Sequence, residues 1–240
     1  MKNAKEIIAR SVILLCVSDR CALEKSTIGG RTYSKKQREE QRLAIYKWLQ
    51  NKGYSVMMTK SERSLFEQEV GSGNKNEILS IQVQYEAIEP CLWTLGLVQK
   101  LSSYDQFVLD DFHQVLQIGM NHTLERVLDA SSLQADEAIQ LQNEISMLWY
   151  WRSIECNNPI FKTSSTKDIV KSVFGNQYEK VLEGIQQFDN QQNDFMVNNK
   201  PFSNLNIEEK KRINCIAKWR QHAFEWIVGD EAWDEVELNT

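Results

Sequence analysis

The chain has 240 residues, with 28 Lys and Arg, 33 Asp and Glu, 42% hydrophobic residues, 10 Gly and 3 Pro. This balance excludes a disordered or collagen-like chain, and the length suffices for a core that needs no disulfide or metal. The formal net charge of -5 disfavours nucleic-acid binding, because phosphate neutralisation requires a basic face. The scarcity of Gly and Pro favours long helices over a β-sandwich or barrel.

The N-terminal part of the sequence predicts helices in close succession. Apolar residues recur at helical spacing, and Ser34 can cap a second helix that would end at Gly53. Thr59 and Glu62 form a capping box for a third helix. Pro90 lies inside the most apolar long segment, where it removes a backbone hydrogen bond, so we expect a kinked central helix. The predicted helical segments are residues 4–25, 34–53, 59–71, 76–97 and 104–118, with a loop at 26–34.

The C-terminal part predicts further helices and one small β-hairpin. Asn206 and Glu209 form another capping box, opening a last helix that would end at Gly229. Asn198-Asn199 tolerates positive φ and therefore predicts a hairpin turn near residues 194–205. The predicted helices cover residues 132 or 136 to about 155, 166–174, 177–188 and 206–229.

Together these segments predict a mostly α fold. We expect a single helical domain over residues 1–240, with a kinked central helix and one small β-hairpin. The composition changes after Asn157-Asn158-Pro159, which divides a larger part, 1–157, from a smaller C-terminal part, 158–240, packed on it.

The cysteines and the apolar runs indicate a cytoplasmic protein. The cysteines contain no C-x-x-C pair and fall mostly in apolar segments, which is typical of buried free thiols in a reducing compartment. Val12 to Val17 is the longest apolar run near the N-terminus and is too short to span a membrane, so no membrane partner is expected. The cysteines are Cys16, Cys21, Cys91, Cys156 and Cys215.

Several segments, taken in their order along the chain, resemble a known family. They are Arg10-Ser11 before an apolar helix, Tyr46-x-Trp48-Leu49, Thr59-x-x-Glu62, Tyr85-Glu86-Ala87 with Leu92-Trp93-x-Leu95-Gly96, Lys200-Pro201-Phe202, Arg220-x-x-Ala223-Phe224-x-Trp226, and Trp233-Asp234-x-Val236-x-x-x-Thr240. Their order and spacing over nearly the whole chain resemble the bacterial family catalogued as "domain of unknown function 4272". The resemblance implies a mostly helical, cytoplasmic, single-domain bacterial protein and assigns it no activity.

The chain departs from the pattern of that family near its C-terminus. The family tends to place a His directly after the Arg that Arg220 matches, whereas here Gln221 follows and His222 stands one position later. The family also tends to place an Asp before the final Thr, where this chain has Asn239. A catalytic use of that His or Asp is therefore not carried over to this chain.

Glu86 is the strongest candidate for a functional charge, because it lies in the middle of an apolar segment. A carboxylate buried there must be paired or neutral, and Arg152 and Arg220 are its candidate partners. We expect a buried network between Glu86 and an arginine that holds three helices together. The alternative is a general base whose pKa is tuned by this pairing, in a hydrolase with a cleft lined by Glu86, Arg152, Arg220 and His222.

No metal or other cofactor is predicted. His222 with Glu225, and Asp110 with His113, each share one helix face, but the chain has no paired Glu-x-x-His motifs for a dinuclear site. A histidine-rich zinc centre would need His113, His122 and His222 to converge. No nucleophile elbow, Walker loop or dinucleotide fingerprint is present in the sequence.

Trp233 follows the last helix in an acidic tail, next to Asp234. It either docks back onto the helices, which burial of its ring favours, or anchors a protein partner together with Asp234. Because no catalytic motif is found, we expect a non-enzymatic binding or interaction protein with a protein partner. The hydrolase stays the alternative, and the sequence leaves substrate and oligomeric state open.

Overall fold

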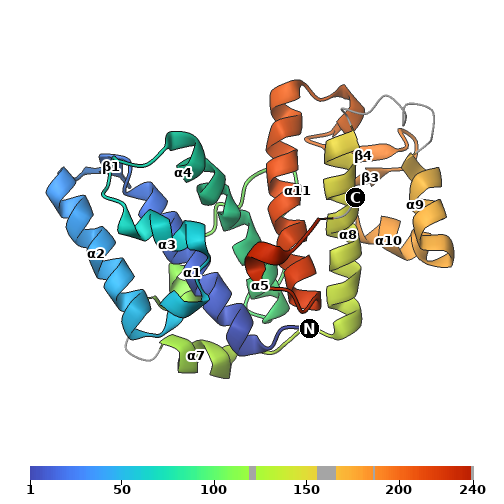
Figure 1. Cartoon of the computed structure of the whole chain (residues 1–240). Coiled ribbons are helices and arrows are strands. Elements are labelled where there is room, and N and C mark those ends of the chain that lie inside the picture. Colours follow the sequence, from blue (N-terminus) through green and yellow to red (C-terminus); the bar gives the residue numbers. More distant parts are fainter. Residues whose placement is uncertain (119–122, 156–165, 186, 239–240) are drawn as a thin grey trace.

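The computed structural model describes residues 1–118, 123–155, 166–185 and 187–238 (Figure 1). It is mostly helical, as predicted, and its described strands form two small antiparallel sheets. The α-helices are α1 (Ala4–Ala22), α2 (Lys35–Asn51), α3 (Lys60–Glu67), α4 (Lys75–Gln82), α5 (Ile88–Thr94), α6 (His113–Leu116), α7 (Thr123–Ala130), α8 (Asp136–Glu155), α9 (Thr166–Phe174), α10 (Tyr178–Gly184) and α11 (Ile207–Val228).

Short 3₁₀ helices and strands connect these helices. The 3₁₀ segments are η1 (Tyr54–Met57), η2 (Val83–Ala87), η4 (Gly175–Gln177), η5 (Phe202–Asn204) and η6 (Trp233–Glu235). The strands are β1 (Thr27–Ile28), β2 (Arg31–Thr32), β3 (Phe188–Asp189), β4 (Asp194–Val197) and β5 (Lys200–Pro201). No helix among the described residues is long and apolar enough to cross a membrane.

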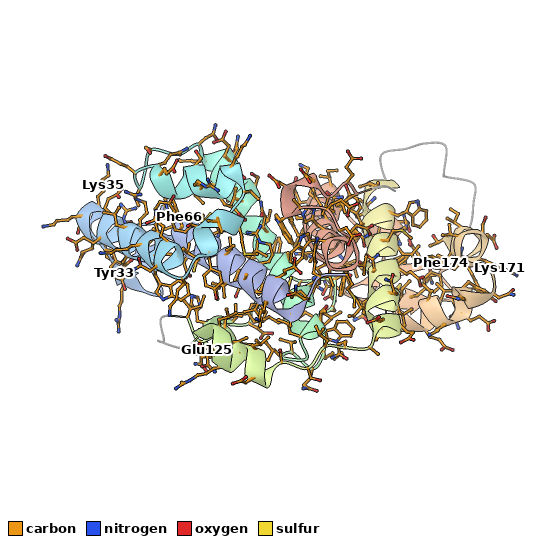
Figure 2. All side chains as sticks on the ribbon, turned by 60° about the horizontal axis from the view of Figure 1, so that its bottom comes forward. Tyr33, Lys35, Phe66, Glu125, Lys171 and Phe174 are labelled. Atoms are coloured by element: carbon orange, nitrogen blue, oxygen red, sulfur yellow. The ribbon has the colours of Figure 1, made fainter. Side chains whose placement is uncertain are left out.

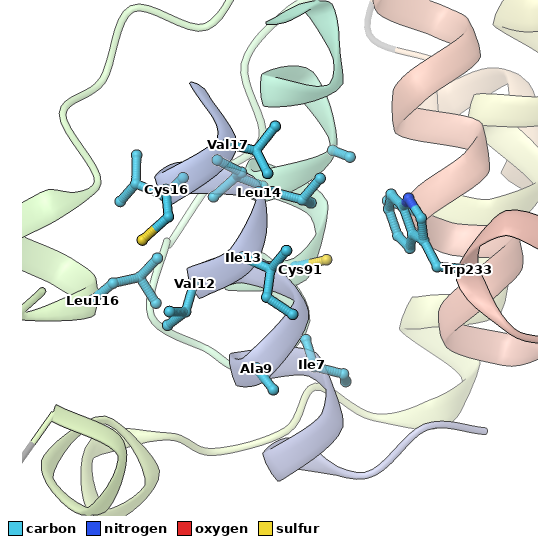
Figure 3. Close-up of a cluster of buried hydrophobic side chains, with 14 of the residues drawn as sticks. Ile7, Ala9, Val12, Ile13, Leu14, Cys16, Val17, Cys91, Leu116 and Trp233 are labelled. Carbon is cyan, nitrogen blue, oxygen red and sulfur yellow. The ribbon is translucent and has the colours of Figure 1, made fainter. Parts of the chain in front are cut away.

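Helix α1 is the centre of the N-terminal helices. Asn3 and Glu6 form its capping box, and nearly every residue from Ile7 to Val17 is buried. Helices α2, α3, α4, α5 and α7 all contact it. Figure 3 shows the α1 side chains packed with Leu116 and Cys91 from neighbouring segments. This wide burial explains why the first apolar run of the sequence covers several faces of one helix.

Helix α11 joins two hydrophobic clusters. Its C-terminal half, including Phe224 and Ile227, packs into the α1 cluster, and its N-terminal half packs with Trp149 and Phe195. It crosses the middle of the molecule between α5 and α8 (Figure 1).

In Figure 2 the Lys35 side chain extends away from the molecule, whereas Phe66 lies among the helices. The predicted boundary at Asn157-Asn158-Pro159 lies outside the described residues.

The predicted central helix is interrupted just before Pro90. Helix α4 passes into η2, and α5 then begins at Ile88. Proline has no N–H to donate to the carbonyl four residues earlier, which belongs to Glu86, and its ring crowds that carbonyl. The regular α-helical bonding therefore cannot continue through this region, and the chain tightens into a 3₁₀ turn that carries Glu86.

The prediction of a helix over residues 104–118 is wrong for most of that segment, since only α6 forms. The backbone N–H of Tyr104 donates to the Gln187 side chain, and the N–H of Val108 donates to Glu86. These donors are satisfied by distant side chains and not by a helical turn. The helix α7, which no prediction covered, follows.

The third helix also ends before the predicted Gly71, at Glu67. Arginines from neighbouring helices bind its last carbonyls: Arg20 donates to the carbonyls of Leu65 and Gln68, and Arg42 to that of Phe66. Carbonyls at a helix end have no partner within the helix, so these buried guanidinium groups substitute for a longer helix.

The β-structure is somewhat richer than predicted. The expected hairpin pairs β4 with β5 across Asn198-Asn199, both at positive φ, 49° and 61°. Strand β3 adds to it because α10 ends at Gly184, earlier than the predicted residue 188. A second hairpin, β1 with β2, turns at Gly29-Gly30, where φ is 54° and 78°. Such a turn favours glycine because both central residues need positive φ.

Candidate functional site

The buried Glu86 carboxylate pairs with Arg220 of α11. Nε and Nη2 of Arg220 donate to Oε2 of Glu86 at 3.1 and 3.0 Å. Both side chains are almost fully buried, with exposed fractions of 2% and 1%. Of the two arginines predicted as partners of Glu86, Arg220 is therefore the one that the structure places there, and the pair links η2 to α11.

The remaining polar atoms of this pair bind the segment between α5 and α6. Oε1 of Glu86 accepts the N–H of Val108 at 2.8 Å. Nη1 of Arg220 donates to the carbonyls of Ser102 and Ser103 at 2.6 and 3.1 Å, and its guanidinium stacks on Tyr104 with 4.8 Å to the ring centre. The ion pair therefore fastens residues 102–108 to the helices at both ends.

A second buried carboxylate, Glu89, lies beside this pair. Its Oε1 accepts the N–H and the hydroxyl of Ser102 at 3.0 and 2.5 Å. Its Oε2 lies 3.9 Å from Nη2 of Arg220 and has no hydrogen-bond partner among the described residues. Burial raises the pKa of Glu86, and Glu89 adds to the rise, against the opposing effect of Arg220. One guanidinium thus serves two buried carboxylates.

An open groove of about 300 Å³ lies beside Glu86. Two of its apolar side chains are well exposed: Leu79 is 57% and Phe107 38% exposed. Val108 is buried, whereas Leu109, the next residue, is 87% exposed. The groove is lined by Ser18 of α1, Leu79 and Gln82 of α4, Val83, Tyr85 and Glu86 of η2, and Phe107 and Val108.

Three carboxylates, which we call the acidic margin, lie around Tyr85 in the groove wall: Asp19, Asp110 and Asp111. The Tyr85 hydroxyl donates to the backbone carbonyl of Asp110 at 2.6 Å. Burial first, and then the negative charges of the acidic margin, raise the pKa of Tyr85 to about 12. The groove therefore combines an apolar wall with a negative edge.

His113 bridges two members of the acidic margin. Its Nδ1 lies 2.6 Å from Asp111 and its Nε2 2.9 Å from Asp19. The hydrogen bond to Asp19, together with the contacts to Asp111, raises the pKa of His113 to about 9, so the ring is protonated at neutral pH. The expectation that Asp110 and His113 share one helix face is wrong, because α6 begins only at His113.

His222 holds the tail of the chain. Its ring is nearly buried, and its Nε2 donates to the backbone carbonyl of Trp233 at 2.9 Å. Burial lowers the pKa of His222 to about 4, so the imidazole is neutral at pH 7. No hydrogen bond joins the side chains of His222 and Glu86.

Trp233 docks back onto the helices, which is the arrangement that burial of its ring was expected to favour. Its ring is 7% exposed and lies against His222, Trp226 and the guanidinium of Arg10, at 4.5, 5.4 and 5.0 Å between centres. In Figure 3 the ring is directed toward the α1 cluster. Asp234 remains exposed at the edge of a hollow of about 450 Å³.

Arg152, the other predicted partner of Glu86, binds Asp194 of β4. Nε and Nη2 donate to the two carboxylate oxygens at 2.8 and 3.0 Å, and the guanidinium stacks on Phe202. Burial alone would raise the pKa of Asp194, but the hydrogen bonds from Arg152 and Ser203 hold this pKa below its usual range. The four residues of the predicted cleft thus have separate partners, apart from Glu86 and Arg220.

The thiols and possible metal ligands form no further centre in the described part of the chain. Cys16, Cys21 and Cys91 are buried and free, and burial raises the pKa of each thiol. Nowhere in the described ranges do three His, Cys, Asp or Glu side chains gather as metal ligands. Cys156 and His122 lie outside those ranges.

Sequence reasoning missed Glu89 and the exposed wall of Leu79 and Phe107. Glu89 could have been found by the argument used for Glu86, since it lies three residues later in the same apolar segment. The wall gives no local signal, because whether an apolar side chain is covered depends on elements distant in sequence.

The sequence model of the family described as Domain of unknown function (DUF4272) matches residues 1–174. Because the match spans more than half of the chain, the chain belongs to this family. No match to the chain was found among curated proteins or among solved structures. The matched range includes the groove and Glu86, whereas the motifs from Lys200 onward, with Arg220 and Trp233, lie beyond it.

Proposed function

We propose that this DUF4272 protein is a non-enzymatic binding protein of the bacterial cytoplasm whose protein partner docks in the groove beside Glu86. The observation that carries the proposal is the exposed apolar wall, formed by Leu79 and Phe107, with Leu109 next to it. Large apolar side chains gathered at a concave surface are typical of interaction sites.

The way the wall is held supports binding. Residues 102–108 are irregular in conformation, yet Glu86 and Arg220 fasten them to the helices. A wall already fixed in its bound position loses less conformational entropy when a partner docks. The buried pair thus acts as a positioning element for Phe107.

The same geometry favours binding over hydrolysis. A general base needs a free oxygen within reach of the substrate proton. Here Oε2 of Glu86 is taken by Arg220 and Oε1 by the N–H of Val108. Arg152 and His222, which the hydrolase hypothesis needs at the same place, bind Asp194 and the Trp233 carbonyl.

The free buried thiols support the cytoplasmic assignment. Cys16 and Cys21 are close in sequence, and neither is engaged in a disulfide. Unpaired thiols of this kind are typical of proteins that work in a reducing compartment.

Site-specific photo-cross-linking tests the proposal. A benzophenone amino acid replaces Leu79, Phe107 or Leu109 in turn, and the protein is irradiated in extract of its native cells. Val173 and Ile207, which are 58% and 60% exposed elsewhere on the surface, are the matched control positions. We expect one discrete adduct from positions 79 and 107, which line the groove, and from the neighbouring position 109, and none from the controls. Equal labelling at all five positions, or none at the groove, contradicts a docking site there.

A further inference from the structure

We infer that the partner segment that fits the groove is cationic as well as apolar: an apolar side chain for the wall, flanked by Lys or Arg for the acidic margin. This inference rests on the proposed docking function and specifies the chemistry of the partner. It arises from the position of Asp19, Asp110 and Asp111 close to Tyr85, which lines the groove.

The acidic margin borders the groove without lining it. Tyr85 lines the groove, and its hydroxyl donates to the backbone carbonyl of Asp110. Ser18, another lining residue, directly precedes Asp19. A segment that places an apolar side chain against Phe107 therefore has its neighbouring residues within reach of these carboxylates.

Among the described residues around the margin, the negative charges outnumber the positive ones. Asp19, Asp110 and Asp111 bring three negative charges, and the protonated His113 returns one positive charge. Helix α4, which supplies the opposite wall, adds one charge of each sign, Lys75 and Glu77. The edge of the groove is thus net negative, and a cationic partner gains from it.

The margin is also accessible to a partner. The side chain of Asp111 is 68% exposed and that of Asp19 32%, and Asp110 is exposed. Its charge repels phosphate groups, so nucleic acids and anionic membrane surfaces are poor occupants of this groove. A protein segment with Lys or Arg beside an apolar residue matches both features.

Two fluorescent synthetic peptides test the inference on the full chain. They share the same apolar residues, and one carries Lys where the other carries Glu. Fluorescence anisotropy at neutral pH gives the affinity of each. We expect the Lys peptide to bind at least about ten-fold more tightly, with a preference that declines as salt is added. The replacement Leu79→Ser should remove binding of the Lys peptide.

A charge variant and its control separate the effect of the acidic margin from the general attraction between a cationic peptide and a negatively charged protein. Asp110→Asn with Asp111→Asn should weaken the Lys peptide roughly five-fold, as expected for two partly exposed ion pairs. The exposed residues Glu40 and Glu208 lie on other helices, so Glu40→Gln with Glu208→Gln removes the same charge and should leave binding unchanged.

Each remaining outcome overturns the inference. If the two peptides bind equally, or if the control variant weakens binding as much as the margin variant, the margin does not select the partner. If neither peptide binds while the groove still cross-links a protein, the docking function stands and the cationic partner is excluded. If cross-linking fails as well, both are rejected.

Discussion

Trp233 and the apolar wall of the groove beside Glu86 both lie against the N-terminal helices, but the two regions differ in how far these apolar side chains are covered. At the first, the Trp233 ring is packed against the helices and is 7% exposed. At the second, Leu79 and Phe107 remain 57% and 38% exposed. Leu109, which follows Phe107 closely in the chain, does not cover them. The groove, whose wall stays exposed, is the surface that we propose a partner completes.

The two regions also differ in the charge of their histidines. His222 is buried and neutral beneath the tail, whereas His113 is half-exposed and protonated at the groove. At the first region the Trp233 ring is held by packing, and the second is bordered by ionised groups that are partly exposed to solvent. The variants below test whether packing and docking are separable in this way.

The largest effect is expected from breaking the buried pair. The change Glu86→Leu removes both hydrogen bonds between Arg220 and its nearest carboxylate and leaves only Glu89, 3.9 Å away, which should cost about 3 kcal/mol of unfolding free energy. Urea denaturation measures this loss. Adding Arg220→Met together with Glu89→Gln should recover much of it, because all three buried charges are then removed. As a control, Glu69→Gln breaks the exposed pair with Lys35 and should change stability by less than about 0.5 kcal/mol. A comparable small loss for Glu86→Leu would contradict the buried pair.

Removing the packed ring of Trp233 should have the next largest effect. Trp233→Ala deletes contacts with His222, Trp226 and Arg10 and should destabilise the chain by about 3 kcal/mol. Thermal unfolding with urea titration measures the loss, and Trp233→Phe should retain part of the stability. Cross-linking from the groove should be unaffected in Trp233→Ala at a temperature where it is folded. A loss of the groove adduct in that variant would mean that the two regions are coupled.

Acid should loosen the tail through His222. Its pKa is about 4 in the folded chain and near 6.5 when unfolded, so the unfolded state binds more protons between these values. Stability should therefore be complete above pH 6.5 and fall toward pH 4, by about 3 kcal/mol at most. His222→Gln can still donate to Trp233 and should lack this part of the slope. Identical pH profiles for the two proteins would be evidence against a neutral buried imidazole.

Alkali should act on the groove through His113, with the opposite sign. Its pKa is about 9 when folded and near 6.5 when unfolded, so its contribution is complete below pH 6.5 and is lost as the pH rises through 9. Melting temperatures between pH 6 and pH 10 measure the decline, which His113→Gln should flatten. The expected effect is small because the ring is largely exposed to solvent. An unchanged alkaline slope in the variant would assign the decline to other groups.

The smallest effect on stability is expected from the groove itself. Leu79 is exposed on α4, so Leu79→Ser should change the unfolding free energy by less than about 1 kcal/mol. The matched change Ile207→Ser at a surface residue of α11 serves as the control. A destabilisation of several kcal/mol would show that Leu79 belongs to the core and not to a docking surface.

Local signals in the sequence were sufficient for much of the fold. The caps at Ser34, Thr59 and Asn206 begin α2, α3 and α11 as predicted, because a cap depends only on residues about three positions apart. Residues 104–118 could not be predicted in the same way. Their backbone donors are taken by Glu86 and Gln187, whose positions are fixed by the tertiary structure.

The candidate site, like the fold, could be predicted from the sequence only in part. A buried Glu86 needs a cation, and that requirement predicted Arg220 across 134 residues. It could not decide between Arg220 and Arg152, because the choice depends on which helix lies beside η2. Arg152 instead binds Asp194, which becomes its neighbour only when β4 packs on α8.

The most direct test of the docking surface is cross-linking from position 107 with and without the change Leu79→Ser. Phe107 and Leu79 line the groove on separate segments, so the partner should contact both. We predict a discrete adduct from position 107 in the otherwise unchanged protein, and its loss in Leu79→Ser at unchanged stability. An adduct of equal yield in both proteins would contradict docking in the groove.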